Sequence, residues 1–131
     1  MGVSFSPRAI AAFVLLAAMA GTVNSAEESL STDLMQAIDD TNKSMASNIA
    51  LKAAKGASDD AKELTEMFAK VEAFYVAKGD AADAVDLARK SRELSAQILR
   101  SVASSDYASA TDSATNLSRT CKTCHNFYKK S

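Results

Sequence analysis

The sequence predicts an all-α protein, folded as an antiparallel up-down-up-down four-helix bundle. Beyond residue 25 the chain has no proline and only two glycines, Gly56 and Gly79, so little in it interrupts a helix. Apolar residues recur there at spacings of three and four, and no stretch alternates between apolar and polar side chains for long. Short connections between such helices make successive helices antiparallel neighbours, which favours the bundle.

The first 25 residues have the order of parts that is typical of a secretory signal peptide. Arg8 is their one charge, and the uncharged stretch Ala9–Gly21 follows it. These thirteen residues are too few to span a bilayer, which takes about 20. We therefore expect residues 1–25 to be cleaved off after Ser25, with Ala26 as a close second cleavage position, and the protein to be periplasmic; an uncleaved membrane anchor is the alternative.

Residues 26–131 have the length of one domain. The full chain carries a formal charge of −1, and removal of Arg8 leaves −2 on this domain. A chain so close to neutral lacks the basic surface that nucleic acid requires, so we expect no nucleic-acid partner. We also expect no membrane span in the domain, and the acids near its turns, such as Asp39, are interpreted as solvated faces and caps.

Three breaks divide the domain into four helices. Two are placed at 54–60 and 77–83, where a glycine follows a helical pattern as a left-handed C-cap does. The third is the serine-rich stretch 102–109. Ser31 or Thr32 can cap the first helix. Each helix is expected to have about 20–25 residues, or a length of roughly 30–37 Å.

Each helix has an apolar stripe that we expect in the core. Cys121 and Cys124 belong to the fourth stripe and His125 flanks it, so all three side chains should point into or along the bundle. In chain order the stripes are Met35, Ile38, Asn42, Met45 and Ile49; Ala61, Leu64, Phe68, Val71 and Tyr75; Ala84, Leu87, Ser91, Leu94 and Ile98; Ala114, Leu117, Cys121, Cys124 and Tyr128.

The stretch CKTCH, residues 121–125, contains both cysteines and the only histidine of the chain. A structural zinc ion needs about four ligands, and three from so short a piece of one helix cannot surround it well. A redox dithiol belongs at a helix N-terminus after a strand, where the helix dipole lowers the thiol pKa, whereas this motif lies near a helix C-terminus. A plain disulfide is a further alternative.

C-x-x-C-H is also the attachment sequence of c-type haem. Cys121 and Cys124 can form thioethers with the two vinyl groups on one edge of the macrocycle, and His125 can then reach the iron as its proximal ligand. Haem attachment to such motifs takes place outside the bacterial cytoplasm, which agrees with the export signal. We therefore expect one covalently attached haem c in the bundle core.

With this motif the chain resembles the class II c-type cytochromes, the cytochrome c-prime type. That family is an exported four-helix bundle with C-x-x-C-H near its C-terminus, followed by x-x-[Phe/Tyr]-[Arg/Lys]; Tyr128 and Lys129 stand at those places. Its members are usually dimers with five-coordinate iron, whereas this chain has shorter helices and tighter turns. Its oligomeric state, a homodimer included, stays open. The chain is also similar to the non-covalent b-type relative, in which a methionine early in the first helix ligates the iron.

The second axial position of the iron decides the expected function. Counting along the antiparallel first and fourth helices, from near Lys55 where the first ends and near Asp106 where the fourth begins, places residue 36 roughly opposite His125. Met35 is therefore the expected distal ligand. The stretch DLMQAIDDTNK also resembles the start of the b-type relative's first helix, with Met35 at the ligand position. Met45, about 15 Å further along the axis, is the second choice. Met67 is expected to be core, and an iron without a methionine ligand stays open.

The function that these residues imply is that of a periplasmic monohaem electron carrier with low-spin iron, serving redox partner proteins. The rival is a five-coordinate cytochrome c-prime that binds NO or CO, with an apolar residue such as Ile38 over the distal face. A third possibility is a haem-bearing subunit or domain that serves one enzyme. No carboxylate pair, nucleophile–base set or phosphate loop indicates catalysis, so the chain is not expected to be an enzyme.

A basic cluster surrounds the attachment motif. It consists of Arg119, Lys122, Lys129 and Lys130. The cluster could dock an acidic redox partner or pair with a haem propionate, although positive charge at a helix C-terminus is favourable in itself.

Overall fold

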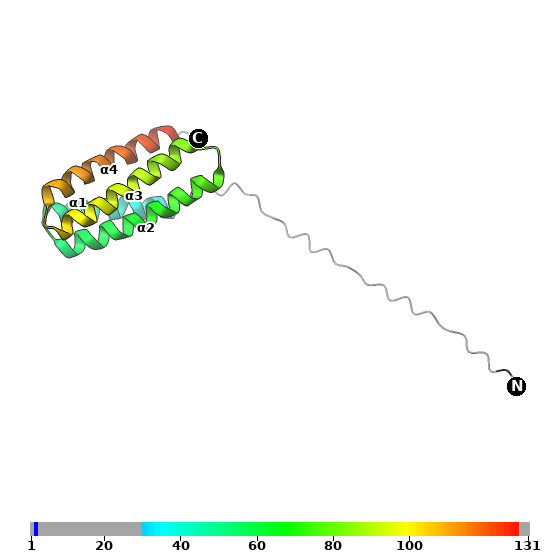
Figure 1. Ribbon diagram of the computed structural model, residues 1–131, viewed down its shortest axis with the longest axis horizontal. Helices are drawn as coiled ribbons and strands as arrows, with labels where there is room; N and C mark the ends of the chain where they lie inside the picture. Colours follow the sequence, from blue (N-terminus) through cyan, green and yellow to red (C-terminus); the bar gives the residue numbers. More distant parts are fainter. Residues whose placement is uncertain (1, 3–29, 129–131) are drawn as a thin grey trace.

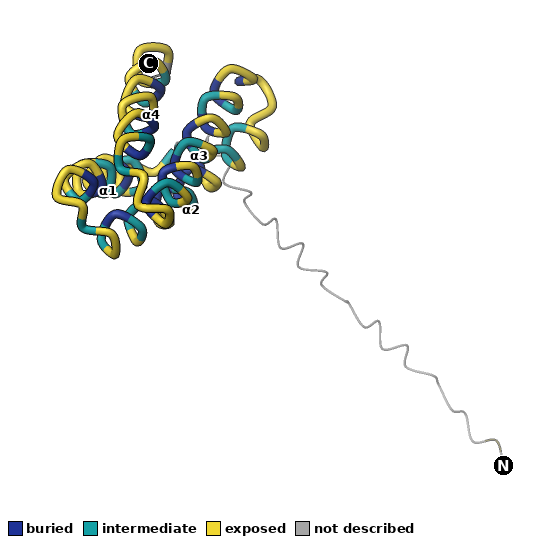
Figure 2. Tube along the Cα trace, turned by 60° about the vertical axis from the view of Figure 1, so that its left-hand side comes forward, coloured by how far each residue is buried: buried dark blue, intermediate teal, exposed yellow. Residues whose placement is uncertain are grey.

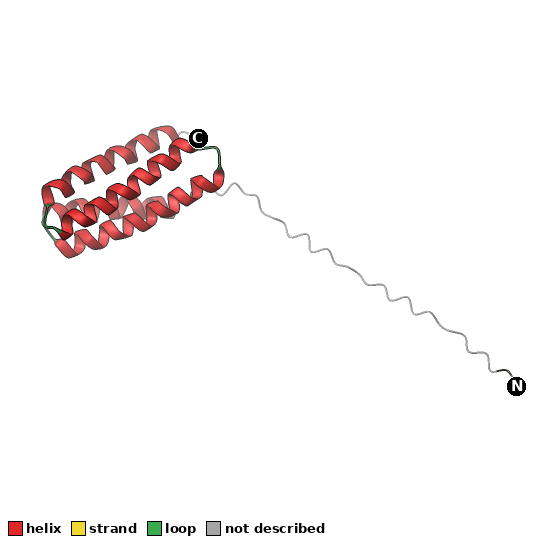
Figure 3. Cartoon of the chain, viewed as in Figure 1, coloured by secondary structure: helices red, strands yellow, loops and turns green. Residues whose placement is uncertain are grey.

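The computed structural model describes Gly2 and residues 30–128 of the chain. The predicted signal peptide and the basic residues Lys129 and Lys130 lie outside this part, Gly2 excepted. Residues 30–128 form four helices joined by short loops, without a strand among them (Figures 1 and 3). The helices are α1 (Thr32–Ala50), α2 (Ala54–Lys78), α3 (Ala82–Ala103) and α4 (Tyr107–Tyr128). The predicted all-α class is confirmed. The helix lengths agree with the prediction in α2, α3 and α4, and α1 is slightly shorter, with 19 residues.

The helices form an up-down-up-down bundle, as predicted. Each helix packs against the next, and α4 returns to α1; α2 and α3 pack most closely, and α1 and α4 least closely, of these pairs. The α1–α2 and α3–α4 turns share one end of the bundle, while the α2–α3 turn and the end of α4 share the other (Figure 1). None of the helices formed by residues 30–128 is both long and apolar enough to cross a membrane.

The first turn lies elsewhere than predicted. Helix α1 has ended and α2 has begun before Gly56 is reached, so this glycine lies in the first turn of α2 and is not a C-cap. The left-handed residue is Lys52, with a φ of 53°. The N–H of Lys52 bonds to the carbonyl of Ile49 at 3.0 Å, and the next N–H bonds to that of Asn48 at 2.8 Å. This pair of bonds is a Schellman helix end built without glycine, which the sequence does not signal.

Gly56 has a packing role instead. A Cβ atom at this position would lie 2.7 Å from Nδ2 of Asn48 on α1, which is closer than real Cβ contacts allow. Asn48 Nδ2 donates a hydrogen bond to Oδ2 of Asp60 at 2.8 Å, and Ser44 Oγ donates to the same oxygen at 2.8 Å. The glycine therefore makes room for a polar contact that ties α1 to α2.

The other two breaks are confirmed. Gly79 ends α2 in the left-handed conformation, with a φ of 80°. Ser105 does the same after α3, with a φ of 58°. Asp106 Oδ1 then caps α4 by accepting a hydrogen bond from the N–H of Ser109 at 3.0 Å, and this bond lowers the pKa of the carboxyl. Ser31 caps α1, as one of the two predicted candidates.

The core follows the predicted stripes in α1 and α2 but is rotated in the other two helices. In Figure 2 the buried segments turn toward the bundle interior. Small side chains bring α3 close to α2, whereas Leu87 and Leu94 are only partly buried. The buried positions of α3 are Ala84, Ala88, Ser91, Ser95, Ile98 and Val102, and those of α4 are Ala110, Ser113, Leu117 and Thr120. Cys121 and Cys124 therefore lie beside the most buried line of α4 and are partly buried themselves.

Candidate functional site

A pocket lies toward the end of the bundle where α1 begins and α4 ends. It encloses about 550 Å³ of space, part of which is open to solvent. All four helices contribute to it, so its walls depend on the complete bundle. The lining residues are Met35, Ile38, Asp39 and Asn42 of α1; Phe68 and Val71 of α2; Leu87, Ala88 and Ser91 of α3; and Cys121, Cys124 and His125 of α4.

The pocket separates the two candidate methionines. Met35 shares it with Cys121, Cys124 and His125, which come from the other end of the chain. Met45 has none of its surface exposed and belongs to the hydrophobic core instead. The structure thus brings Met35 and the C-x-x-C-H residues together and leaves the second choice outside the pocket.

The helix count that favoured Met35 used a wrong starting point. It assumed that α1 ends near residue 55, whereas α1 ends at Ala50. The corrected count moves the level opposite His125 by more than one turn toward the start of α1. Met35 remains about one turn from that level, and both residues line the same pocket.

Both cysteines are free thiols whose surroundings favour the protonated form. Burial raises the pKa of Cys121 to about 11, and the neighbouring Cys124 and the charge of Asp39 add to this effect. Burial also raises the pKa of Cys124. Catalytic dithiols have lowered pKa values, because the thiolate is the reactive species. These thiols therefore lack the activation that a redox dithiol requires.

Within the described residues, no three side chains of histidine, cysteine, aspartate or glutamate come together in a group that could hold a metal ion. The iron of a haem takes four ligands from the macrocycle and needs at most two from the protein. Such a site is therefore compatible with a single histidine on one helix and a methionine on another.

Two polar residues of α1, Asp39 and Asn42, line the pocket although neither is predicted as a site residue. Asp39 was assigned to a solvated face, but it lines the pocket while its side chain remains 55% exposed. Lys43 Nζ lies 2.6 Å from its Oδ2. Asn42 was expected in the core stripe, and it also lines the pocket. Their spacing in the sequence indicates this position. Asp39 and Asn42 follow Met35 by four and seven residues and so share its face of the helix.

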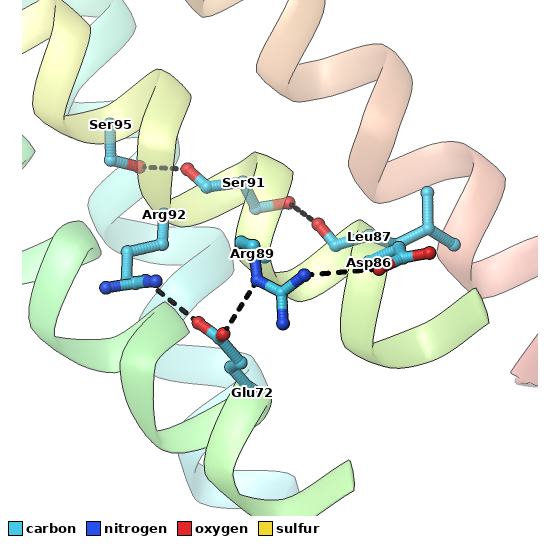
Figure 4. A network of polar contacts seen from close by, with 7 residues as sticks. All are labelled: Glu72, Asp86, Leu87, Arg89, Ser91, Arg92 and Ser95. Atoms are coloured by element: carbon cyan, nitrogen blue, oxygen red, sulfur yellow. Dashed lines mark hydrogen bonds and ion pairs between the residues drawn. The ribbon is translucent and has the colours of Figure 1, made fainter. Parts of the chain in front are cut away.

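The α2–α3 side of the pocket is held by an ion-pair cluster (Figure 4). Glu72 of α2, with a side chain only 15% exposed, lies between two arginines of α3. Arg89 Nε donates a hydrogen bond to Oε1 at 3.1 Å, while Arg92 Nε lies 2.9 Å from Oε2 in an ion pair without hydrogen-bond geometry. Ser91 Oγ donates to the carbonyl of Leu87 at 2.8 Å, so its hydroxyl is satisfied within α3. The cluster links α2 to α3 through residues that are sequence neighbours of the pocket-lining Val71, Ala88 and Ser91.

The residues present fit a covalently held haem. The α4 side offers two protonated thiols and an imidazole at the spacing that haem attachment uses. The α1 side offers the thioether of Met35, and Phe68 and Val71 provide apolar surface from α2. Imidazole nitrogen and thioether sulfur are the protein ligands of iron in cytochromes c.

The chain was compared with protein-family models, with curated proteins and with solved structures, and nothing matched in any of the three comparisons.

Proposed function

We propose that this protein is a monohaem c-type cytochrome of the class II kind, which carries single electrons between redox partner proteins in the periplasm and is not an enzyme. The observation that carries the proposal is the shared pocket of Met35, Cys121, Cys124 and His125. A haem bound there supplies a one-electron couple at its iron. The apolar leader predicted at residues 1–25 supports export, which haem attachment to C-x-x-C-H requires.

In this proposal the residues of α4 bind the macrocycle and the iron. Cys121 and Cys124 hold one edge of the haem as thioethers, which prevents its loss and fixes its orientation. His125 is the proximal iron ligand. It follows Cys124 directly in the sequence, so attachment of the haem edge brings the imidazole close to the iron.

Helix α1 supplies the opposite side of the site. Met35 is the distal ligand, and a histidine–methionine pair raises the reduction potential of the iron. Ile38, which is 4% exposed, and the apolar residues of α2 line the pocket with apolar surface. With His125 and Met35 both held as ligands, the haem would have no place for a substrate and would supply one-electron chemistry alone.

A second candidate function rests on Ile38. Its side chain lines the same wall as Met35 and is almost completely buried. If Ile38 rather than Met35 covers the distal side, the iron is five-coordinate and the protein binds NO or CO. Both functions use the same attachment residues and differ only in the α1 side of the pocket.

Optical spectra of the oxidised and reduced protein, with and without carbon monoxide, test the proposal. Iron with histidine and methionine ligands is low-spin in both states and takes up carbon monoxide slowly or not at all. A high-spin spectrum with rapid carbon monoxide uptake would favour the gas-binding function. The absence of any haem spectrum in protein exported from a cell that attaches haem would contradict both.

A further inference from the structure

We infer that Asp39 tunes the reduction potential of the haem, as a fixed negative charge on the pocket wall that favours the oxidised iron. The inference rests on the proposed function and goes beyond it, because Asp39 is neither an attachment residue nor an iron ligand. It assigns a role to a residue that faces the site and has no part in binding the cofactor.

The position of Asp39 carries the inference. It lines the pocket on α1, one helical turn after Met35 and next to the buried Ile38. Its side chain is 55% exposed, so water can still solvate the carboxylate. The charge is also felt across the pocket, where it contributes to the raised pKa of Cys121 on α4. Asp39 and Cys121 line the same pocket, so a haem attached at Cys121 would share that pocket with the carboxylate.

The direction of the effect follows from charge. Oxidation removes one electron from the haem and leaves it more positive by one unit. A nearby negative charge stabilises that state and lowers the reduction potential. Lys43 lies one turn further along α1, with its Nζ 2.6 Å from Asp39, and its positive charge offsets part of this effect. Partial exposure of both side chains weakens the interaction but does not change its sign.

The next residue provides a matched control. Asp40 carries the same charge on the same helix, but it does not line the pocket. Its Oδ1 accepts a hydrogen bond from Nε2 of Gln36 at 3.0 Å on the exposed surface. Asp39→Asn and Asp40→Asn therefore remove one charge each with almost no change in shape, and they differ in whether that charge faces the pocket.

The test measures the midpoint potential of the haem-loaded protein in the wild type and three variants. We expect Asp39→Asn to raise the potential, Lys43→Gln to lower it, and Asp40→Asn to shift it clearly less than Asp39→Asn, with the low-spin spectrum unchanged throughout. Equal shifts for the two aspartate variants would overturn the inference. If Asp39→Asn does not fold, the Lys43→Gln variant still decides, because an unchanged or raised potential contradicts the inference.

A second measurement needs no haem. In haem-free chains that carry Cys124→Ser, the alkylation rate of Cys121 at a fixed pH below its pKa reports the local charge. Asp39→Asn is expected to speed this alkylation and Asp40→Asn to leave it nearly unchanged. A faster alkylation without a change in potential overturns the tuning role and leaves the proposed function intact. A chain that never acquires haem overturns both.

Discussion

Separate replacement of Met35 and Met45 tests whether Met35 is the iron ligand that we propose and Met45 a core side chain. Met45 has none of its surface exposed and packs in the hydrophobic core. Truncation of such a residue to alanine costs about 2–5 kcal/mol of unfolding free energy, because it loses buried apolar surface and leaves a cavity. Met35 is only partly buried and lines a pocket that already exists. Met35→Ala should therefore cost the haem-free chain only about 1 kcal/mol.

Urea unfolding of the haem-free chain measures these costs. With a denaturant dependence of about 1–3 kcal/mol per molar urea, Met45→Ala should lower the midpoint by roughly 1 M or more, and Met35→Ala by much less. In the haem-loaded protein, Met35→Ala should be the variant with the larger effect on the iron. Met35→Ala should lower the reduction potential and open the iron to carbon monoxide, while Met45→Ala leaves the spectrum unchanged.

Leucine variants keep the comparison valid if Met45→Ala fails to fold. Leucine nearly conserves the volume of methionine, so either replacement should cost less than about 1.5 kcal/mol of stability. Met35→Leu still removes the proposed sulfur ligand, whereas Met45→Leu removes only a core thioether. The reasoning is refuted if a Met45 variant opens the iron to carbon monoxide and the corresponding Met35 variant does not.

Three further predictions concern the turns and a thiol. Lys52→Gly should stabilise the chain by about 1 kcal/mol in urea unfolding, since it relieves a left-handed backbone; a loss would contradict the assigned turn. Gly56→Ala should bring none of the usual gain of about 1 kcal/mol, because its Cβ meets Asn48, and should bring that gain in an Asn48→Ala background. Burial raises the pKa of Cys121 from 9.0 to about 11, so the folded state retains a proton that the unfolded state releases. Reduced, haem-free protein should thus keep its full stability below pH 9 and lose about 1.4 kcal/mol per pH unit up to pH 11. A Cys121→Ser variant with an equally steep decline would refute this.

The fold could be predicted because helical periodicity runs almost unbroken from residue 32 to 128. The first turn could not, because it depends on backbone geometry at Lys52, a residue with no turn preference. The helix end was predicted at Gly56 because glycine commonly ends helices. In the structure the missing side chain of Gly56 instead leaves space for Asn48. The misplaced α1–α2 connection shifted the residue expected opposite His125 by more than one helical turn along α1. Met35 still lines the same pocket as His125, because side chains one helical turn apart lie on the same face of a helix.

The site could be predicted where chemistry concentrates in sequence, as it does in CKTCH. The rest of the pocket comes from all four helices, and no local pattern distinguishes a pocket-lining Phe68 from an ordinary core residue. Asp39 was assigned to solvent because carboxylates usually lie at the surface. Its carboxylate is half exposed and also borders the pocket, which only the packing of α1 against α4 reveals.

The central claim is that Cys121 and Cys124 hold a haem covalently in the pocket. Denaturing electrophoresis followed by haem staining tests it most directly, on protein exported from a cell that attaches haem to C-x-x-C-H motifs. We expect a staining band at the mass of the processed chain, resistant to acid-acetone extraction, and no such band for the Cys121→Ala, Cys124→Ala double variant. A colourless wild-type protein with a Cys121–Cys124 disulfide would contradict the account.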